Sequence, residues 1–206
     1  MSTIGIIAVI GGVMIELIAA TNNANKLREF RQILGNDFKV MSLKEVGISV
    51  DVEEDADTFY GNALKKAKVI SELTGKASLA DDSGLIVDAL DGAPGVYSAR
   101  YGGEDGNDVL NRQKLLKEMD GISDRKARFH STIVLYFPSG EVIRAEGNVE
   151  GEILYEETGD NGFGYDNLFY SIDLGESFGT ATEEAKNGVS HRGRALQQLV
   201  EKLNQR

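Results

Sequence analysis

The chain has 206 residues, of which 41% are hydrophobic and 27% are charged, a composition typical of one globular domain or of one domain folded as two lobes. It contains no cysteine and two histidines, which excludes a disulfide framework and a cysteine-based zinc site and favours an intracellular, cytoplasmic setting. The formal net charge of −11 argues against nucleic acids and anionic membranes as partners, because both would be repelled at a distance.

The apolar segment over residues 4–20 resembles a signal peptide or a membrane anchor in composition. Glu16 interrupts it, however, no Lys or Arg precedes it, and it is short for a membrane span. We therefore predict that residues 1–13 are a leader or an added extension and that residues 15–20 form a buried strand. Residues 14–206 are then expected to form a single two-lobed domain.

After the first strand, a polar loop leads into an apolar stripe over residues 27–34, which predicts a helix that ends at Gly35. A second helix is predicted over residues 58–73, because apolar residues recur there at steps of three and four and Gly75 follows. The stretches "ASLA" and "LIVDAL" predict two short strands, separated by a turn at Asp-Asp-Ser-Gly over residues 81–84.

In the second half, a glycine-rich loop precedes a helix predicted over residues 108–119. The alternating residues 127–137 predict a strand, and residues 138–151 are expected to turn back as its antiparallel partner. Residues 158–170 are predicted to be a loop, and a helix is predicted from about Ser190 onward. This order indicates a mixed α/β fold with a long antiparallel ribbon.

The polar loop "ATNNANK" is a candidate phosphate site. Backbone N–H groups and the positive end of the following helix attract anions, and Lys26 adds a mobile positive charge. An ordinary turn capped by asparagine is the alternative, since the loop contains neither a Walker A motif nor a dinucleotide fingerprint.

Four acidic residues are candidate ligands of a divalent cation. Glu53 and Glu54 lie in the acidic stretch "VDVEEDADT" and can join Asp81 and Asp82, because Mg²⁺ prefers oxygen ligands and often bridges carboxylates to substrate phosphates. A solvated acidic loop is the alternative for that stretch. Adjacent residues in an extended chain point in opposite directions, so we expect one aspartate to face the site and the other to cap a turn.

Two further stretches have the chemistry of a base-binding site. "GFGYD" supplies an aromatic ring for stacking on a planar base and a carboxylate for its edge, although packing of this loop on the core is equally compatible. In "SHRGRAL", His191 and Arg192 occupy the first turn of a helix, where cations oppose the helix dipole unless an anionic or carbonyl-bearing partner is present.

Taken together and in this order, six stretches resemble the inosine triphosphate pyrophosphatase family, whose members remove non-standard purine nucleoside triphosphates. The stretches are "ATNNANKLREF", "EEDADTFYGNALKKA", "LADDSGLIVDALDGAPGVYSARYGG", "ARFHSTIVL", "GFGYDNLF" and "SHRGRAL". They span about residues 14–204. The resemblance implies an elongated α/β fold of two lobes around a central mixed sheet, with a nucleotide cleft between the lobes, and usually a homodimer. The implied reaction is hydrolysis of ITP, dITP or XTP to the nucleoside monophosphate and pyrophosphate with Mg²⁺ as cofactor.

The resemblance also implies roles for individual residues. Asp82 would be the general base, and Glu54 and Asp82 would hold magnesium, with Glu53 as a further candidate ligand. The residues implied to bind the triphosphate are Thr21, Asn22, Asn23, Ala24, Asn25, Lys26, Lys66 and Ser83. Those implied to bind the base and ribose are Phe163, Gly164, Tyr165, Asp166, Lys186, His191 and Arg192.

Three positions depart from the family pattern. Asn167 stands where many relatives have proline, Gly61 stands where some have glutamate, and the stretch before Lys186 matches weakly. Two alternative functions stay open at this point: a related pyrophosphatase for other modified nucleotides, and a nucleotide-binding sensor without catalysis.

Overall fold

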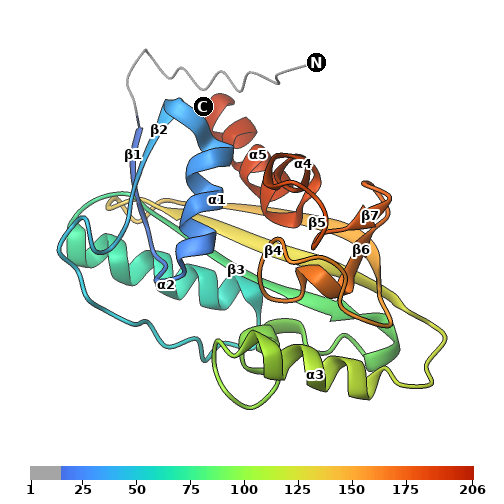
Figure 1. Cartoon of the computed structure of the whole chain (residues 1–206). Coiled ribbons are helices and arrows are strands. Elements are labelled where there is room, and N and C mark those ends of the chain that lie inside the picture. The colour runs from blue at the N-terminus through green and yellow to red at the C-terminus, as the bar shows by residue number, and fades with distance from the viewer. Residues whose placement is uncertain (1–14) are drawn as a thin grey trace. The chain divides into compact units, whose positions relative to one another are not determined.

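Within residues 15–206, which the computed structural model describes, seven strands form one sheet in the order β2-β1-β3-β4-β5-β6-β7 (Figure 1). The leader predicted over residues 1–13 therefore lies outside the described residues. β1 (Ile15–Ala19) pairs in parallel with β2 (Phe38–Met41) and β3 (Ser78–Val87), whereas β6 pairs antiparallel with both β5 and β7. The sheet is thus mixed, which confirms the predicted fold class.

The other strands are β4 (Lys126–Tyr136), β5 (Val142–Ile153), β6 (Phe169–Ser171) and β7 (Glu176–Ser177). The α-helices are α1 (Ala24–Leu34), α2 (Phe59–Thr74), α3 (Asp108–Glu118), α4 (Glu183–Val189) and α5 (His191–Asn204). The predicted ribbon is confirmed, because β4 and β5 are neighbours in the sheet and are joined by a tight turn in which the Phe137 N–H donates to the Glu141 carbonyl at 2.9 Å.

The described chain divides into two compact units. Unit 1 holds the residues up to Asp82 together with residues 132–146 and 195–206, and unit 2 holds residues 83–131 and 147–194. The strands β3, β4 and β5 contribute residues to both units.

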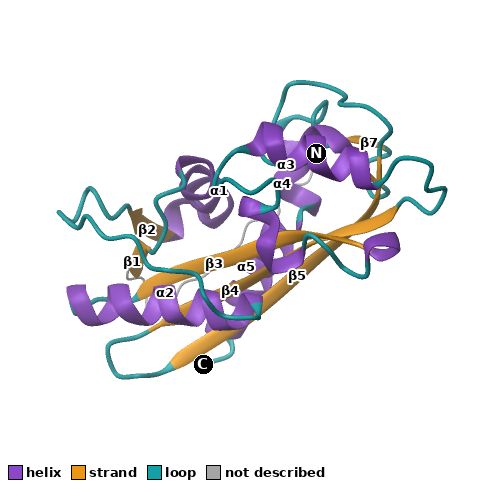
Figure 2. Cartoon of the chain, turned by 90° about the horizontal axis from the view of Figure 1, so that it is seen from below, coloured by secondary structure: helices purple, strands orange, loops and turns teal. Residues whose placement is uncertain are grey.

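Unit 1 is built of three layers, with the sheet in the middle (Figure 1). On one face, α1 and α5 bury Phe30 and Leu199 against strand residues such as Leu79. On the other face, Ile70 of α2 packs against strand residues such as Ala80, and Figure 2 shows α2 lying along the strands. Leu79 and Ala80 belong to different cores because successive side chains of a strand point to opposite faces.

Unit 2 has an aromatic core. The ring of Phe169 lies 4.7 Å from that of Phe129 and 5.2 Å from that of Phe178, between centroids. Leu115 and Met119 are buried in the same cluster, which fixes α3 to this unit.

Two predictions about secondary structure are wrong. β3 runs unbroken from Ser78 to Val87, so residues 81–84 form no turn. The strand lies between two other strands, and it is buried on both faces over most of its length, a pattern that alternation of polar and apolar residues does not reveal. The loop predicted over residues 158–170 ends in β6, which begins at Phe169.

No helix among residues 15–206 is long and apolar enough to cross a membrane.

Candidate active site

Five charged side chains of unit 1 form what we call the lysine–carboxylate cluster. Its members are Lys26 of α1, Lys66 of α2, Glu54 of the segment before α2, and Asp81 and Asp82 of β3. All five were singled out in the sequence as candidate phosphate-binding or cation-binding residues, and the structure brings them together.

The two adjacent aspartates face different helices. The Asp81 carboxylate lies 2.8 Å from the Lys26 ammonium of α1, and its side chain is fully buried. The Asp82 carboxylate accepts a hydrogen bond from the Asn62 side chain of α2 at 3.0 Å. The expectation that they point apart is therefore confirmed, but the expectation that one caps a turn is wrong, because both lie inside a strand.

Lys66 joins the acidic segment to β3. Its ammonium lies 2.5 Å from Glu54 Oε1 and donates to the Asp81 carbonyl at 2.9 Å. An ammonium carries three N–H bonds, one more than these two partners use. Lys26 likewise has two acceptors within the described residues, both on Asp81, so each lysine retains a donor for a further anion.

The carboxylates of the cluster differ in acidity. Burial raises the pKa of Asp82 to about 6, against the opposing charges of Lys66 and Lys26 and the hydrogen bond from Asn62. Burial also acts to raise the pKa of Glu54, but the charge of Lys66 and its hydrogen bond outweigh burial and lower it. Burial therefore brings the pKa of Asp82 toward neutrality, where a general base works best.

Asn62 is a member of the site that the sequence interpretation missed. The side chain is fully buried, and besides donating to Asp82 it accepts a hydrogen bond from the Ala56 N–H at 2.9 Å. It therefore ties the acidic segment to β3. Its position four residues before Lys66, on the same face of α2, is a signal that could have identified it.

The loop before α1 is a capped turn. The Asn23 side chain accepts from the N–H groups of Asn25 and Lys26 at 2.9 and 3.1 Å, and the Asn23 N–H donates to Thr21 Oγ1 at 3.0 Å. The exposed residues of the loop are Asn22, Asn23 and Ala24. Because the cap already occupies two helix N–H groups, the Lys26 ammonium is the strongest anion-binding group that this loop offers.

Glu53 and Glu54 are placed differently. Glu53 is exposed, whereas Glu54 is half-buried against Lys66. No group of three or more His, Cys, Asp or Glu side chains in residues 15–206 is arranged to hold a metal ion. Glu54 and Asp82 nevertheless fit magnesium, because this ion commonly uses one or two protein carboxylates and completes its shell with phosphate oxygens and water.

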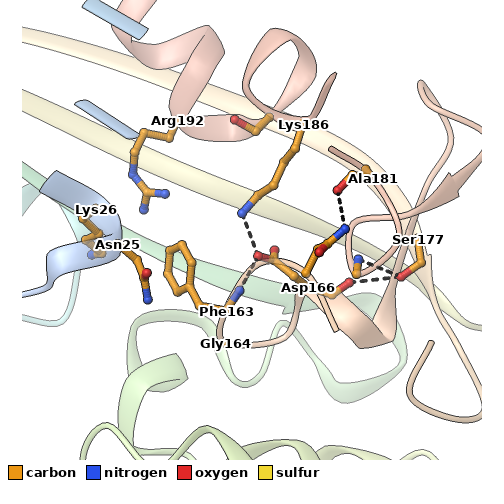
Figure 3. A network of polar contacts seen from close by, with 12 residues as sticks. Asn25, Lys26, Phe163, Gly164, Asp166, Ser177, Ala181, Lys186 and Arg192 are labelled. Atoms are coloured by element: carbon orange, nitrogen blue, oxygen red, sulfur yellow. Dashed lines mark hydrogen bonds and ion pairs between the residues drawn. The ribbon is translucent and has the colours of Figure 1, made fainter. Parts of the chain in front are cut away.

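In unit 2, Phe163, Asp166 and Lys186 form the centre of what we call the aromatic cluster (Figure 3). The Asp166 carboxylate accepts a hydrogen bond from the Phe163 N–H at 2.8 Å and lies 2.6 Å from the Lys186 ammonium. That ammonium lies 4.8 Å from the centroid of the Phe163 ring, within the range of a cation–π contact. The structure therefore brings Lys186 to the "GFGYD" loop although the sequence around it matched the family weakly.

Three further predicted residues of unit 2 are held by specific contacts. Arg192 is buried and donates to Ser83 Oγ at 2.9 Å, and its guanidinium carbon lies 5.9 Å from the Phe163 ring centroid. The His191 ring stacks on Phe129 at 4.8 Å between centroids, with 15° between the planes. These contacts hold the His191 and Arg192 side chains of the "SHR" stretch against other residues of unit 2.

The two aromatic residues of the loop differ in environment. Phe163 is half-buried, whereas Tyr165 is buried in the core of unit 2 and its hydroxyl donates to the Ser98 carbonyl at 2.8 Å. Burial raises the pKa of the Tyr165 phenol. Between them Gly164 has a φ of +64°, a backbone conformation that favours glycine. Of these rings, Phe163 is the one available to a ligand.

A sequence profile of the Ham1 family matches residues 17–202. A dITP/XTP pyrophosphatase of Clostridium tetani is 50% identical over 191 residues, which cover 91% of this chain and 95% of the relative. A dITP/XTP pyrophosphatase of Geobacter sulfurreducens is 49% identical over 193 residues, which cover 92% of this chain and 97% of the relative.

Two solved structures are similar over nearly the whole chain. A HAM1 protein from Coxiella burnetii has a TM-score of 0.84 at 38% identity and matches 94% of this chain and 100% of its own. The Staphylococcus aureus Ham1 protein has a TM-score of 0.83 at 39% identity, with 92% of this chain and 98% of its own matched.

Proposed function

The chain belongs to the Ham1 family, and on that premise we propose that it hydrolyses non-standard purine nucleoside triphosphates to the nucleoside monophosphate and pyrophosphate. Its substrates would be dITP, ITP and XTP, and its role would be to remove these compounds from the nucleotide pool. The relatives named dITP/XTP pyrophosphatase, about half identical over most of the chain, support this assignment.

The observation that carries the proposal is the composition of the lysine–carboxylate cluster. Lys26 and Lys66 place two ammonium groups, each with a donor to spare, beside the buried carboxylate of Asp82. Hydrolysis of a phosphoanhydride requires neutralisation of phosphate charge and an aligned water, and these residues supply both without a covalent nucleophile.

Asp82 is proposed to accept the proton of a water molecule as the water oxygen attacks the α phosphorus. The new bond joins that oxygen to phosphorus, the anhydride bond breaks, and pyrophosphate leaves with its charge balanced by Lys26 and Lys66. Asn62 holds the Asp82 carboxylate in place for this step.

Glu54 and Asp82 would hold magnesium, for which their carboxylate oxygens are suited. When bound, the ion would neutralise phosphate charge during the reaction. The Lys66 contact keeps Glu54 charged and directed into the cluster, as a ligand of this kind requires.

The aromatic cluster is proposed to bind the purine. The half-buried Phe163 ring offers a stacking surface, and Lys186 and Arg192 offer only hydrogen-bond donors. Hypoxanthine and xanthine carry a carbonyl at the 6-position, which accepts from such donors, whereas the 6-amino group of adenine does not.

We further propose that the protein acts in the cytoplasm, which its cysteine-free composition supports. We also propose that it forms a homodimer, which the family resemblance supports. Light scattering coupled to size-exclusion chromatography tests the dimer: a mass of about 22 kDa, that of one chain, would contradict it.

The function is tested by incubating the protein with magnesium and, separately, dITP, XTP, GTP, ATP and dUTP, and by quantifying pyrophosphate and orthophosphate. We expect rapid release of pyrophosphate from dITP and XTP and slow release from ATP. Preferential turnover of dUTP would favour a pyrophosphatase for other nucleotides, and tight binding of dITP without turnover would favour a sensor.

A further inference from the structure

Two residues of α3 bind the backbone of Gly164, the residue that follows Phe163. Asp108, the first residue of α3, accepts a hydrogen bond from the Gly164 N–H at 2.8 Å. One helical turn later, the Arg112 guanidinium donates to the Gly164 carbonyl at 2.9 Å. Residues four apart lie on the same face of a helix. Asp108 and Arg112, which we call the α3 clamp, therefore bind both polar backbone groups of one loop residue.

The clamp adds to the hydrogen bonds that the loop makes within itself. The Phe163 N–H donates to the Asp166 carboxylate at 2.8 Å, and the Phe163 carbonyl accepts from the Asp166 N–H at 3.2 Å. The polar groups of Gly164 bond to Asp108 and Arg112. The backbone that carries the Phe163 ring is therefore held both by its own loop and by a helix.

The helix that provides the clamp is itself firmly held. Leu115 and Met119, at its C-terminal end, are fully buried in the core of unit 2. The buried Asn111 side chain accepts from the Gly102 N–H at 2.6 Å and donates to the Ala99 carbonyl at 3.0 Å. The clamp therefore ties the loop to α3, a helix that is packed in the core of unit 2.

Arg112 is also held from the side of the loop. Its Nε lies 3.0 Å from Glu157 Oε1, and the Asn167 amide donates to Glu157 Oε2 at 2.6 Å. Asn167 lies beyond Gly164 in the same stretch of chain. Its side chain therefore adds a link from the loop, through Glu157, to the clamp.

We infer that Asp108 and Arg112 are positioning residues for base recognition: by fixing Gly164 they hold the Phe163 ring in the orientation that stacks on a purine. A ring that is already ordered loses less conformational freedom when the base binds, so the clamp strengthens base binding without contacting the base. The identity of the base rests on the proposed function, whereas the effect of the clamp on Phe163 does not.

The effect on Phe163 is tested without substrate. The chain has no tryptophan, so Phe163→Trp creates a single fluorescent reporter. Into this background we would place Asp108→Ala and Arg112→Met, the conservative Asp108→Asn and Arg112→Lys, and Gln113→Ala, which changes an exposed residue of the same helix. We expect stronger acrylamide quenching and lower anisotropy for the first two variants, and values near the parent for the other three.

The effect on recognition is tested by kinetics in the chain that retains Phe163. We expect the KM for dITP to rise about tenfold in Asp108→Ala and in Arg112→Met, as for loss of one charge-assisted hydrogen bond, with kcat changed little and the preference for dITP over dATP reduced. The conservative variants should recover most of the KM.

Two results would overturn the inference: quenching in both truncated variants equal to that of Gln113→Ala, or a loss of kcat at constant KM. Circular dichroism and thermal midpoints identify any variant that fails to fold, and the remaining truncation then decides. If the unmodified protein does not turn over dITP, the proposed function fails, while the quenching result still decides whether the clamp orders Phe163.

Discussion

Replacing Asp82 by asparagine should stabilise the ligand-free protein at neutral pH while it abolishes most of the turnover. Burial raises the pKa of this carboxyl from 3.8 to about 6, which corresponds to about 3 kcal/mol at about 1.4 kcal/mol per tenfold change. Asparagine is neutral and retains an oxygen that can accept from Asn62, so the variant avoids the cost of a buried charge and keeps the hydrogen bond.

The stability of the parent relative to Asp82→Asn should fall as the pH rises. Because the pKa of Asp82 is higher in the folded protein than in the unfolded chain, its contribution to stability is fully present below pH 3.8 and is lost as the pH rises through about 6. The free energy of unfolding of Asp82→Asn should therefore equal that of the parent near pH 4 and exceed it by up to about 3 kcal/mol at pH 8.

Urea unfolding followed by circular dichroism at pH 4, 6 and 8, in the presence of EDTA, measures this difference. Asp105→Asn is the matched control, because Asp105 is exposed, and we expect it to change stability little at any of these pH values. A buried charge at Asp82 is ruled out as a source of instability if Asp82→Asn is less stable than the parent at pH 8, or if the difference between them does not vary with pH.

Three other substitutions test single contacts. Lys186→Met leaves the buried Asp166 carboxylate without its ammonium partner, and we expect a loss of about 3–5 kcal/mol in the free energy of unfolding, measured by urea titration. Gly162→Ala forces a positive-φ position and drives a methyl group into Asp166, so a loss of about 1–3 kcal/mol is expected in the same assay, and an unchanged midpoint would contradict it. Asn62→Ala should lower kcat for dITP about tenfold or more, because Asp82 loses a hydrogen bond to its charged form, whereas a rise in KM alone would argue against a positioning role.

The elements that the sequence predicted well are those whose signals are local. α2 was predicted within a residue at each end, because its apolar stripe lies between a capping residue, Thr58, and a left-handed glycine, Gly75. The β4–β5 hairpin was predicted from alternation and a turn that contains Gly140. Short elements without such a pattern, β2, β7 and α4, were not predicted.

The continuity of β3 was not predictable from local chemistry, because the charges that stabilise Asp81 and Asp82 come from elsewhere in the chain. Lys26, 55 residues away from Asp81, pairs with its carboxylate, and Lys66, 15 residues away, binds its carbonyl. Two adjacent aspartates, which predicted a turn in the sequence, are therefore compatible with a buried strand.

Strand alternation predicted that the aspartates point apart, but it did not say which of them meets which helix. That depends on the face of the sheet on which α1 and α2 pack, a property of the whole fold. The same limit explains why Tyr165, whose ring enters the core, was grouped with Phe163.

The proposed reaction breaks the bond between the α and β phosphates of a non-standard purine nucleotide. Phosphorus NMR of dITP incubated with the protein and magnesium tests it directly. We expect dIMP and pyrophosphate to appear together in equal amounts while orthophosphate stays at background. Release of orthophosphate with dIDP would show cleavage at the β–γ bond and would contradict the proposed function.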